Sequence, residues 1–187
     1  MNPGEISMER ADVVISSRTD EVVKVRKSIG AFSRRIGFSD DAVSEIEVAV
    51  GEALANAVCH GSPEGEDDTV EISYRQVPDR YLEIVVRDHG EGFDLQERVK
   101  HARPLSLTEG DRGIVLICAL MDEVSYYHTV AGGHLHMKKH VRRADDPDRK
   151  RRLFRASTGE DRPPLQNEGK QNQFRVAAMV HRLRPAG

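Results

Sequence analysis

Three polar residues spaced four apart, Glu52, Asn56 and His60, are the first candidates for chemistry in this sequence. In a helix with 3.6 residues per turn, they project within about 80° of one another along one face. The amide oxygen of Asn56 suits Mg²⁺, a hard cation that takes oxygen ligands. The carboxylate of Glu52, one turn earlier, could then accept a proton from an attacking hydroxyl near the same metal. On spacing alone, a solvated polar helix face explains the pattern equally well.

A second candidate site follows an apolar run, at the sequence Asp88-His89-Gly90-Glu91-Gly92. A carboxylate can accept a hydrogen bond from an exocyclic amine such as that of adenine. Glycines have no Cβ, so they let the backbone pass close to a flat ring. Asp88, Gly90 and Gly92 are therefore candidates for binding a base. The alternative is an ordinary glycine-rich turn.

A third candidate is a glycine-containing segment that precedes an apolar run and includes Gly110, Asp111, Arg112 and Gly113. Helix N-termini offer unpaired backbone amides to phosphates, and glycines let the chain approach them. The Walker pattern GxxxxGK[ST] is absent from the sequence. Plain helix capping explains this segment as well as phosphate binding does.

The elements that would position these residues follow from two periodicities. Alternating β-branched residues predict strands, and apolar residues three to four apart predict helices. The predicted order is strand 11–16, helix 19–36, helix 39–60, strand 69–77, strand 81–87, loop 88–112 with one helical turn around 95–99, helix 113–121, strand 124–128 and strand 135–141. The turn at 78–80 predicts that the two strands around it form an antiparallel hairpin. Because strands mostly group with strands, the pattern predicts an α+β two-layer sandwich.

Composition and charge divide the chain into two parts. Its 187 residues are 38% hydrophobic and 32% charged, which is typical of a globular protein with one main core. Residues 1–141 hold 16 Lys and Arg against 25 Asp and Glu, whereas residues 142–187 hold 12 against 6. We predict one domain over 1–141 and a basic, flexible extension over 142–187. The acidic domain argues against direct nucleic-acid binding, which draws on Lys and Arg contacts to phosphate.

Signals for export or membrane insertion are not found in the sequence. The longest apolar run, 114–121, is far shorter than the ~20 residues that a membrane-spanning helix needs. The first residues contain no apolar stretch of signal-peptide length. Cys59 and Cys118 form neither a CxxC pair nor a zinc pattern. We therefore expect a cytoplasmic protein with reduced thiols and no membrane contact.

Taken in order, four motifs resemble the anti-sigma factor serine/threonine kinases (RsbW-like) of the GHKL, or histidine kinase-like, ATPase superfamily. The motifs are EALANAVCHG, VRDHGEGFD, GDRGIVLICALMDEV and GGHLHMKKHV. The resemblance covers about residues 11–141. It implies a Bergerat-type ATP-binding fold, a two-layer α/β sandwich with a mixed, mostly antiparallel sheet, which binds ATP and Mg²⁺ between its helices and one face of the sheet.

The resemblance also implies a role for each matching residue. Glu52 would be the general base, Asn56 the Mg²⁺ ligand and His60 a neighbouring residue of the same motif. Asp88 would read adenine, with Gly90 and Gly92 lining the pocket. The phosphate end would be formed by Gly110, Arg112 and Gly113.

Proteins of this family bind a sigma factor and phosphorylate a serine or threonine of a STAS-fold anti-anti-sigma protein, and the resemblance implies a homodimer. Glu52 favours this group over sensor histidine kinases, which usually have an apolar residue there. Two positions depart from the family pattern: Asp111 replaces a common glycine, and His134 a common threonine. A carboxylate beside a triphosphate repels it unless Arg112 or the metal offsets the charge. The departures motivate an alternative, a nucleotide-binding partner-switching module without kinase activity.

Overall fold

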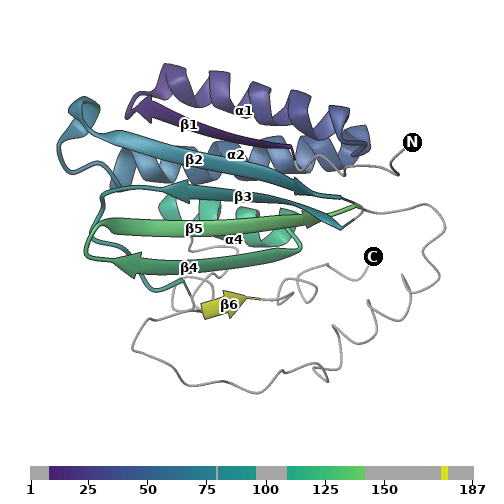
Figure 1. Ribbon diagram of the computed structural model, residues 1–187. Helices are drawn as coiled ribbons and strands as arrows, with labels where there is room; N and C mark the ends of the chain where they lie inside the picture. Colours follow the sequence, from purple (N-terminus) through teal and green to yellow (C-terminus); the bar gives the residue numbers. More distant parts are fainter. Residues whose placement is uncertain (1–8, 79, 96–108, 142–173, 177–187) are drawn as a thin grey trace, which may run out of the picture.

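The computed structural model describes residues 9–78, 80–95, 109–141 and 174–176. In this part of the chain, three α-helices lie on one face of a six-stranded sheet (Figure 1). The elements in chain order are β1 (Arg10–Ser16), α1 (Thr19–Arg35), α2 (Asp40–His60), the short 3₁₀ helix η1 (Gly65–Asp67), β2 (Thr69–Val77), β3 (Tyr81–Arg87), α4 (Glu109–Leu120), β4 (Glu123–Thr129), β5 (Gly132–His140) and β6 (Phe174–Val176). The predicted α+β two-layer sandwich is confirmed.

The strands run in the order β1-β2-β3-β5-β4-β6, and each neighbouring pair is antiparallel. The predicted hairpin is β2 with β3, where Tyr74 lies opposite Ile84. A second hairpin joins β4 to β5. The pairing of β3 with β5 sets Arg87 opposite His134. As a result, the loop after β3 and the start of β5 meet at one end of the sheet.

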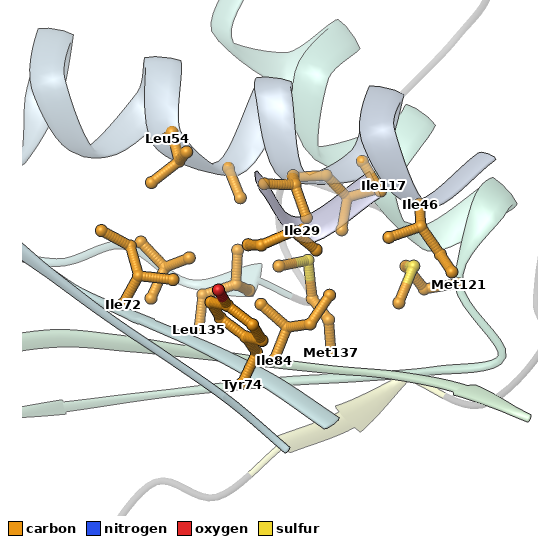
Figure 2. Packing of buried hydrophobic residues seen from close by; sticks show 14 of the residues in the cluster. Ile29, Ile46, Leu54, Ile72, Tyr74, Ile84, Ile117, Met121, Leu135 and Met137 are labelled. Carbon is orange, nitrogen blue, oxygen red and sulfur yellow. The ribbon is translucent and has the colours of Figure 1, made fainter. Parts of the chain in front are cut away.

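The core lies between the helices and the inner face of the sheet. Ile46 and Leu54 of α2 face Ile72 and Ile84 of the sheet (Figure 2), and each of these side chains is at most 1% exposed. Burying one such side chain stabilises the fold by about 1.5 to 3 kcal/mol relative to leaving it in water. Aliphatic packing thus fixes the rotation of α2 about its axis, which decides where its polar residues point.

Helix α2 is the longest in the described part, with 21 residues. The predicted start is confirmed, because the hydroxyl of Ser39 accepts a hydrogen bond from the amide of Ala42 at 3.4 Å. Asp40 and Asp41 place negative charge in the first turn, where it interacts favourably with the helix dipole and stabilises the helix. The helix ends at His60, one residue before Gly61. The whole Glu-Asn-His motif therefore lies on one uninterrupted helix.

A buried lysine connects the sheet to two helices. Lys139 of β5 is 2% exposed, and its ammonium group donates to the carboxylate of Glu45 in α2 and to the backbone oxygen of Leu120 in α4. A buried ammonium group is costly unless it is paired and hydrogen-bonded in this way. These contacts help to fix α2 and α4 relative to each other.

The prediction was wrong about where helix α4 begins. α4 begins at Glu109, four residues before the predicted start at Gly113. Glycine is disfavoured in helix interiors, so the sequence pattern assigned Gly110 to the loop and placed Gly113 at the start of the helix. The predicted C-terminal extension and the predicted helical turn at 95–99 lie only partly within the described residues. Residues 174–176 of the predicted extension form β6 beside β4. The rest of that extension, and residues 96–99 of the predicted helical turn, lie outside the described residues.

Candidate functional site

The polar face of α2 does not simply point into solvent. Glu52 and Asn56 are half-buried, whereas His60 near the helix end is exposed. The other face packs into the core through Val50 and Leu54, both of them fully buried. The solvated-face explanation therefore fits His60 but not the other two residues, which meet a neighbouring element.

That neighbouring element is the first part of α4. A Cβ built on Gly113 would lie 2.8 Å from Oε2 of Glu52, and 3.4 and 3.6 Å from Nδ2 and Oδ1 of Asn56. A side chain at position 113 would therefore collide with the carboxylate. Glycine leaves the carboxylate undisturbed at this point, where the backbone of α4 approaches α2 closely. The structure thus brings Glu52 and Asn56 of one motif close to Gly113 of another.

The first turn of α4 contains Gly110 and Arg112. The first four amides of an α-helix have no partner within the helix and attract anions. Arg112 is exposed, so its guanidinium group is accessible from solvent. The arrangement combines a carboxylate, an amide oxygen and the N-terminal turn of a helix within one small region. These groups fit a magnesium-bound phosphate, since Mg²⁺ prefers oxygen ligands and shares them with substrate phosphates.

Asp88, directly after β3, is the centre of the second cluster. Its Oδ1 accepts hydrogen bonds from the amides of Gly90, at 2.9 Å, and of Gly133, at 3.4 Å. The backbones of Asp88 and Gly133 also exchange two hydrogen bonds, of 3.0 and 3.1 Å. Among the described residues, both hydrogen bonds to the carboxylate end on Oδ1. The half-buried carboxylate is therefore fixed in orientation, while Oδ2 can accept a hydrogen bond from a bound amine.

Glycines surround this carboxylate on several sides. A Cβ on Gly61 would lie 2.5 Å from Cβ and Cγ of Asp88, and one on Gly133 would lie 2.9 and 3.1 Å from its two oxygens. A Cβ on Gly90 would lie 2.7 Å from the Cα of Gly61. Side chains at any of these positions would fill the space around Asp88. Because these residues have no Cβ, the backbone around Asp88 packs closely against its side chain.

Gly61 and Gly133 are residues that the sequence reasoning missed. The sequence explained Gly61 as the end of a helix and Gly133 as part of a turn. Each also meets Asp88, which is distant in sequence. A signal was available in the motifs themselves, because Gly61 ends the motif EALANAVCHG and Gly133 is the second residue of the motif GGHLHMKKHV. Gly92, by contrast, was predicted and is exposed, with a left-handed φ of 82°.

Helix α2 joins the two clusters into one site. The loop after β3 docks on the end of α2, where the amide of His89 donates to the backbone oxygen of Gly61 at 2.9 Å. Nine residues separate Glu52 from Gly61, which corresponds to about 13 Å along a helix axis. The Asp88 cluster thus lies at the end of α2, and Glu52 and Asn56 lie earlier on the same helix beside Gly113, an arrangement compatible with a base at the first place and phosphates at the second. This fits ATP with Mg²⁺.

His134, one of the two departures from the family pattern, does not point into this cluster. Along β5, Gly133 and Leu135 are buried toward the helices, so His134 lies on the opposite face of the sheet. Its ring stacks on Tyr127 at 4.5 Å. Burial, and then the positive charge of Arg87, hold the pKa of His134 below its usual value. Within the residues that the structure describes, no three His, Cys, Asp or Glu side chains gather as a metal site.

Comparison with known proteins agrees with this geometry. The sequence model of the family described as "Histidine kinase-like ATPase domain" matches residues 15–139. The serine-protein kinase RsbW of Listeria innocua is 31% identical over 127 residues, which cover 64% of this chain and 80% of the relative. RsbW of Bacillus licheniformis is 37% identical over 108 residues, covering 54% and 66%.

The fold comparison points the same way. A solved structure of the RsbU and RsbW domains of a Mycobacterium tuberculosis protein aligns with a TM-score of 0.55 at 17% identity. It covers 73% of this chain and 34% of that one. At this identity, the likeness concerns the fold. The chain therefore belongs to the histidine kinase-like ATPase family and, within it, to the RsbW-like group. No helix in the described ranges is long and apolar enough to cross a membrane.

Proposed function

We propose that this chain is an anti-sigma factor with serine/threonine-protein kinase activity. It binds ATP with Mg²⁺, sequesters a sigma factor, and phosphorylates a STAS-fold anti-anti-sigma protein. The observation that carries the proposal is the close approach of Gly113, just after the first turn of α4, to Glu52 and Asn56 of α2. The names of the relatives, serine-protein kinase RsbW, support the same reaction.

In this reaction, Glu52 accepts the proton of the attacking serine or threonine hydroxyl. The hydroxyl oxygen forms a bond to the γ-phosphorus, and the bond from that phosphorus to the bridging oxygen breaks. ADP leaves with the electron pair. A positioned base of this kind contributes roughly 10²- to 10⁴-fold to a rate. Half-burial beside α4 holds the carboxylate where a second protein could present its hydroxyl.

The remaining residues bind and orient the nucleotide. Asn56 would hold Mg²⁺, which supplies charge neutralisation for the phosphates. Asp88 would accept a hydrogen bond from the amino group of adenine. The glycines around it would leave room for the ring, and the first turn of α4 would receive the phosphates. The residues assigned to binding are Asn56, His60, Asp88, Gly90, Gly92, Gly110, Arg112 and Gly113, with Gly61 and Gly133 added from the structure.

We also propose a domain boundary near residue 141, since the family match ends at 139. Residues 1–141 form the ATPase domain, and residues 142–187 form a basic extension. The extension contributes β6 to the sheet edge. A homodimer in the cytoplasm is part of the same proposal.

A second candidate is a nucleotide-binding partner-switching module without kinase activity. The observation that favours it is Asp111 in the first turn of α4, because a carboxylate near the triphosphate repels it.

The test is transfer of labelled phosphate from ATP to the cognate STAS-fold protein. Wild type is expected to transfer phosphate, and Glu52→Gln is expected to slow transfer by about 10²- to 10⁴-fold without loss of ATP affinity. The matched control is Glu47→Gln, also on α2, whose carboxylate faces Arg34 of α1 at 3.8 Å. It should transfer at the wild-type rate. ATP binding by wild type without any transfer would favour the second candidate, and an unchanged rate in Glu52→Gln would refute the role of Glu52.

A further inference from the structure

The loop 88–93, which carries Asp88, is held by a histidine that the proposed reaction does not use. His128 lies near the end of β4, and its Nε2 is 3.0 Å from the backbone oxygen of Gly90. A carbonyl oxygen only accepts hydrogen bonds, so Nε2 carries the hydrogen. On its other side, the amide of Gly90 donates to Oδ1 of Asp88. Gly90 is thus fixed between the base-binding carboxylate and His128.

The same imidazole ring lies against the second glycine of the loop. A Cβ on Gly92 would lie 2.6 Å from Cδ2 and 2.8 Å from Cγ of His128. The ring therefore occupies the space that a side chain at position 92 would take. With a φ of 82°, Gly92 already adopts a conformation that favours glycine. One side chain thus contacts both glycines of the motif.

His128 also belongs to the part of the sheet that orients Asp88. In the pairing of β4 with β5 it lies opposite Gly133, whose amide donates to both the backbone oxygen and Oδ1 of Asp88. Two residues earlier on the same side of β4, Tyr126 stacks on Phe93 with 4.1 Å between ring centroids. The strand therefore contacts the loop at its middle and at its end. These contacts keep the loop in one conformation before any ligand binds.

We propose that His128 is a positioning residue for adenine binding, an inference that rests on the proposed nucleotide site. Its Nε2–H holds the oxygen of Gly90, and its ring supports Gly92, so the loop presents Asp88 in the orientation that binding needs. The residue does not touch the phosphate end at Glu52. Its effect therefore falls on nucleotide affinity and base selectivity, and not on the rate of phosphate transfer at saturating ATP.

The experiment compares three single variants of the full chain. His128→Phe keeps a ring over Gly92 but removes the donor, and His128→Gln restores a side-chain N–H. The matched control is His134→Phe, the same chemical change on the other face of the sheet. Dissociation constants for ATP and GTP, KM for ATP, kcat and the melting temperature are measured for each protein.

Loss of one neutral hydrogen bond predicts that His128→Phe weakens ATP binding about two- to tenfold. KM for ATP should rise similarly, kcat should stay at the wild-type value, and the preference for ATP over GTP should shrink. His128→Gln should recover most of the affinity, and His134→Phe should bind ATP like wild type. Wild-type affinity in a folded His128→Phe would overturn the inference, as would equal losses in both phenylalanine variants.

A second measurement separates this inference from the proposed function. Amide hydrogen exchange of the peptide containing residues 88–93 is followed in nucleotide-free protein, where no ATP is needed. Faster exchange in His128→Phe, reversed in His128→Gln, is expected if the histidine fixes the loop. Unchanged exchange would overturn the positioning role. If wild type fails to bind ATP while the loop still loosens in His128→Phe, the proposed function fails and the positioning of the loop stands.

Discussion

Replacement of Gly113 by alanine should make the protein more stable and less active at once. Alanine is favoured over glycine inside a helix by about 1 kcal/mol, which raises a melting temperature by about 2 to 4 °C in a chain of this size. The new Cβ would lie 2.8 Å from Oε2 of Glu52. A comfortable contact needs about 3.5 Å, so the carboxylate must move by about 0.7 Å. Because Oε2 ends a flexible side chain, it can move without unfolding the helix.

The displaced carboxylate should slow phosphate transfer. A misplacement of about 1 Å at a reacting group can cost about 10²-fold, so Gly113→Ala should lose between about tenfold and a hundredfold. The assay is transfer of labelled phosphate to the cognate STAS-fold protein at saturating ATP, together with a thermal melt. The matched control is Gly51→Ala on α2, whose Cβ would meet Cδ of Arg26 at 3.3 Å and no side-chain atom of Asn56 within 4 Å. Its transfer rate should equal that of wild type. A wild-type rate in folded Gly113→Ala, or equal losses in the two variants, would refute this reasoning.

Two further predictions concern the base-binding end and the outer face of the sheet. Gly61→Ala places a Cβ 2.5 Å from the side chain of Asp88 and should abolish measurable ATP binding in a calorimeter. The control is Gly37→Ala, where φ is 95° and the space is open, which should lower stability without changing ATP affinity. Equal ATP affinity in the two variants would contradict this prediction. Burial holds the pKa values of His134 and His136 below the usual 6.5. The unfolded chain therefore takes up protons first as pH falls below 6.5, so the stability that these residues provide above 6.5 is lost as pH falls further toward their folded pKa values. Urea unfolding across this range should show the decline, and replacement of both histidines by phenylalanine should flatten it; an unchanged slope would count against the assignment.

Much of the fold followed from local patterns in the sequence. The alternation in β2 and β3 and the turn between them predicted an antiparallel hairpin, which the structure confirms. The predicted helix start at residue 39 is also confirmed, because the hydroxyl of Ser39 caps α2. These features depend on residues close together in the chain. Local chemistry alone is enough to recognise them.

The start of α4 and the glycines around Asp88 could not be derived in this way. Helix α4 has a glycine at position 113 where a Cβ would displace the carboxylate of Glu52, which lies on another helix. Gly61 is required by Asp88 and Gly90, beyond its role at the end of α2. Such close approaches join residues that are distant in sequence. Only the folded arrangement reveals why glycine, which looks like a loop residue, belongs there.

The site residues also differ in how far the sequence alone could identify them. The spacing of Glu52 and Asn56 suggested a shared face, but only their contact with α4 distinguishes that face from a solvated one. His128 carried no signal at all, because a single histidine at a strand end is common on protein surfaces. Its hydrogen bond to Gly90 depends on the pairing of β4 with β5, which brings it beside the loop.

The central claim is that one nucleotide binds with its base at Asp88. Calorimetric titration of ATP and Mg²⁺ into wild type and Asp88→Asn tests it most directly. Asparagine preserves the shape of the side chain but removes the charge that strengthens its hydrogen bonds. Wild type should bind one ATP per chain, and Asp88→Asn should bind it about 10- to 100-fold more weakly, as expected for a hydrogen bond to a charged group. Equal affinities in the two proteins, or no ATP binding by wild type, would contradict the account.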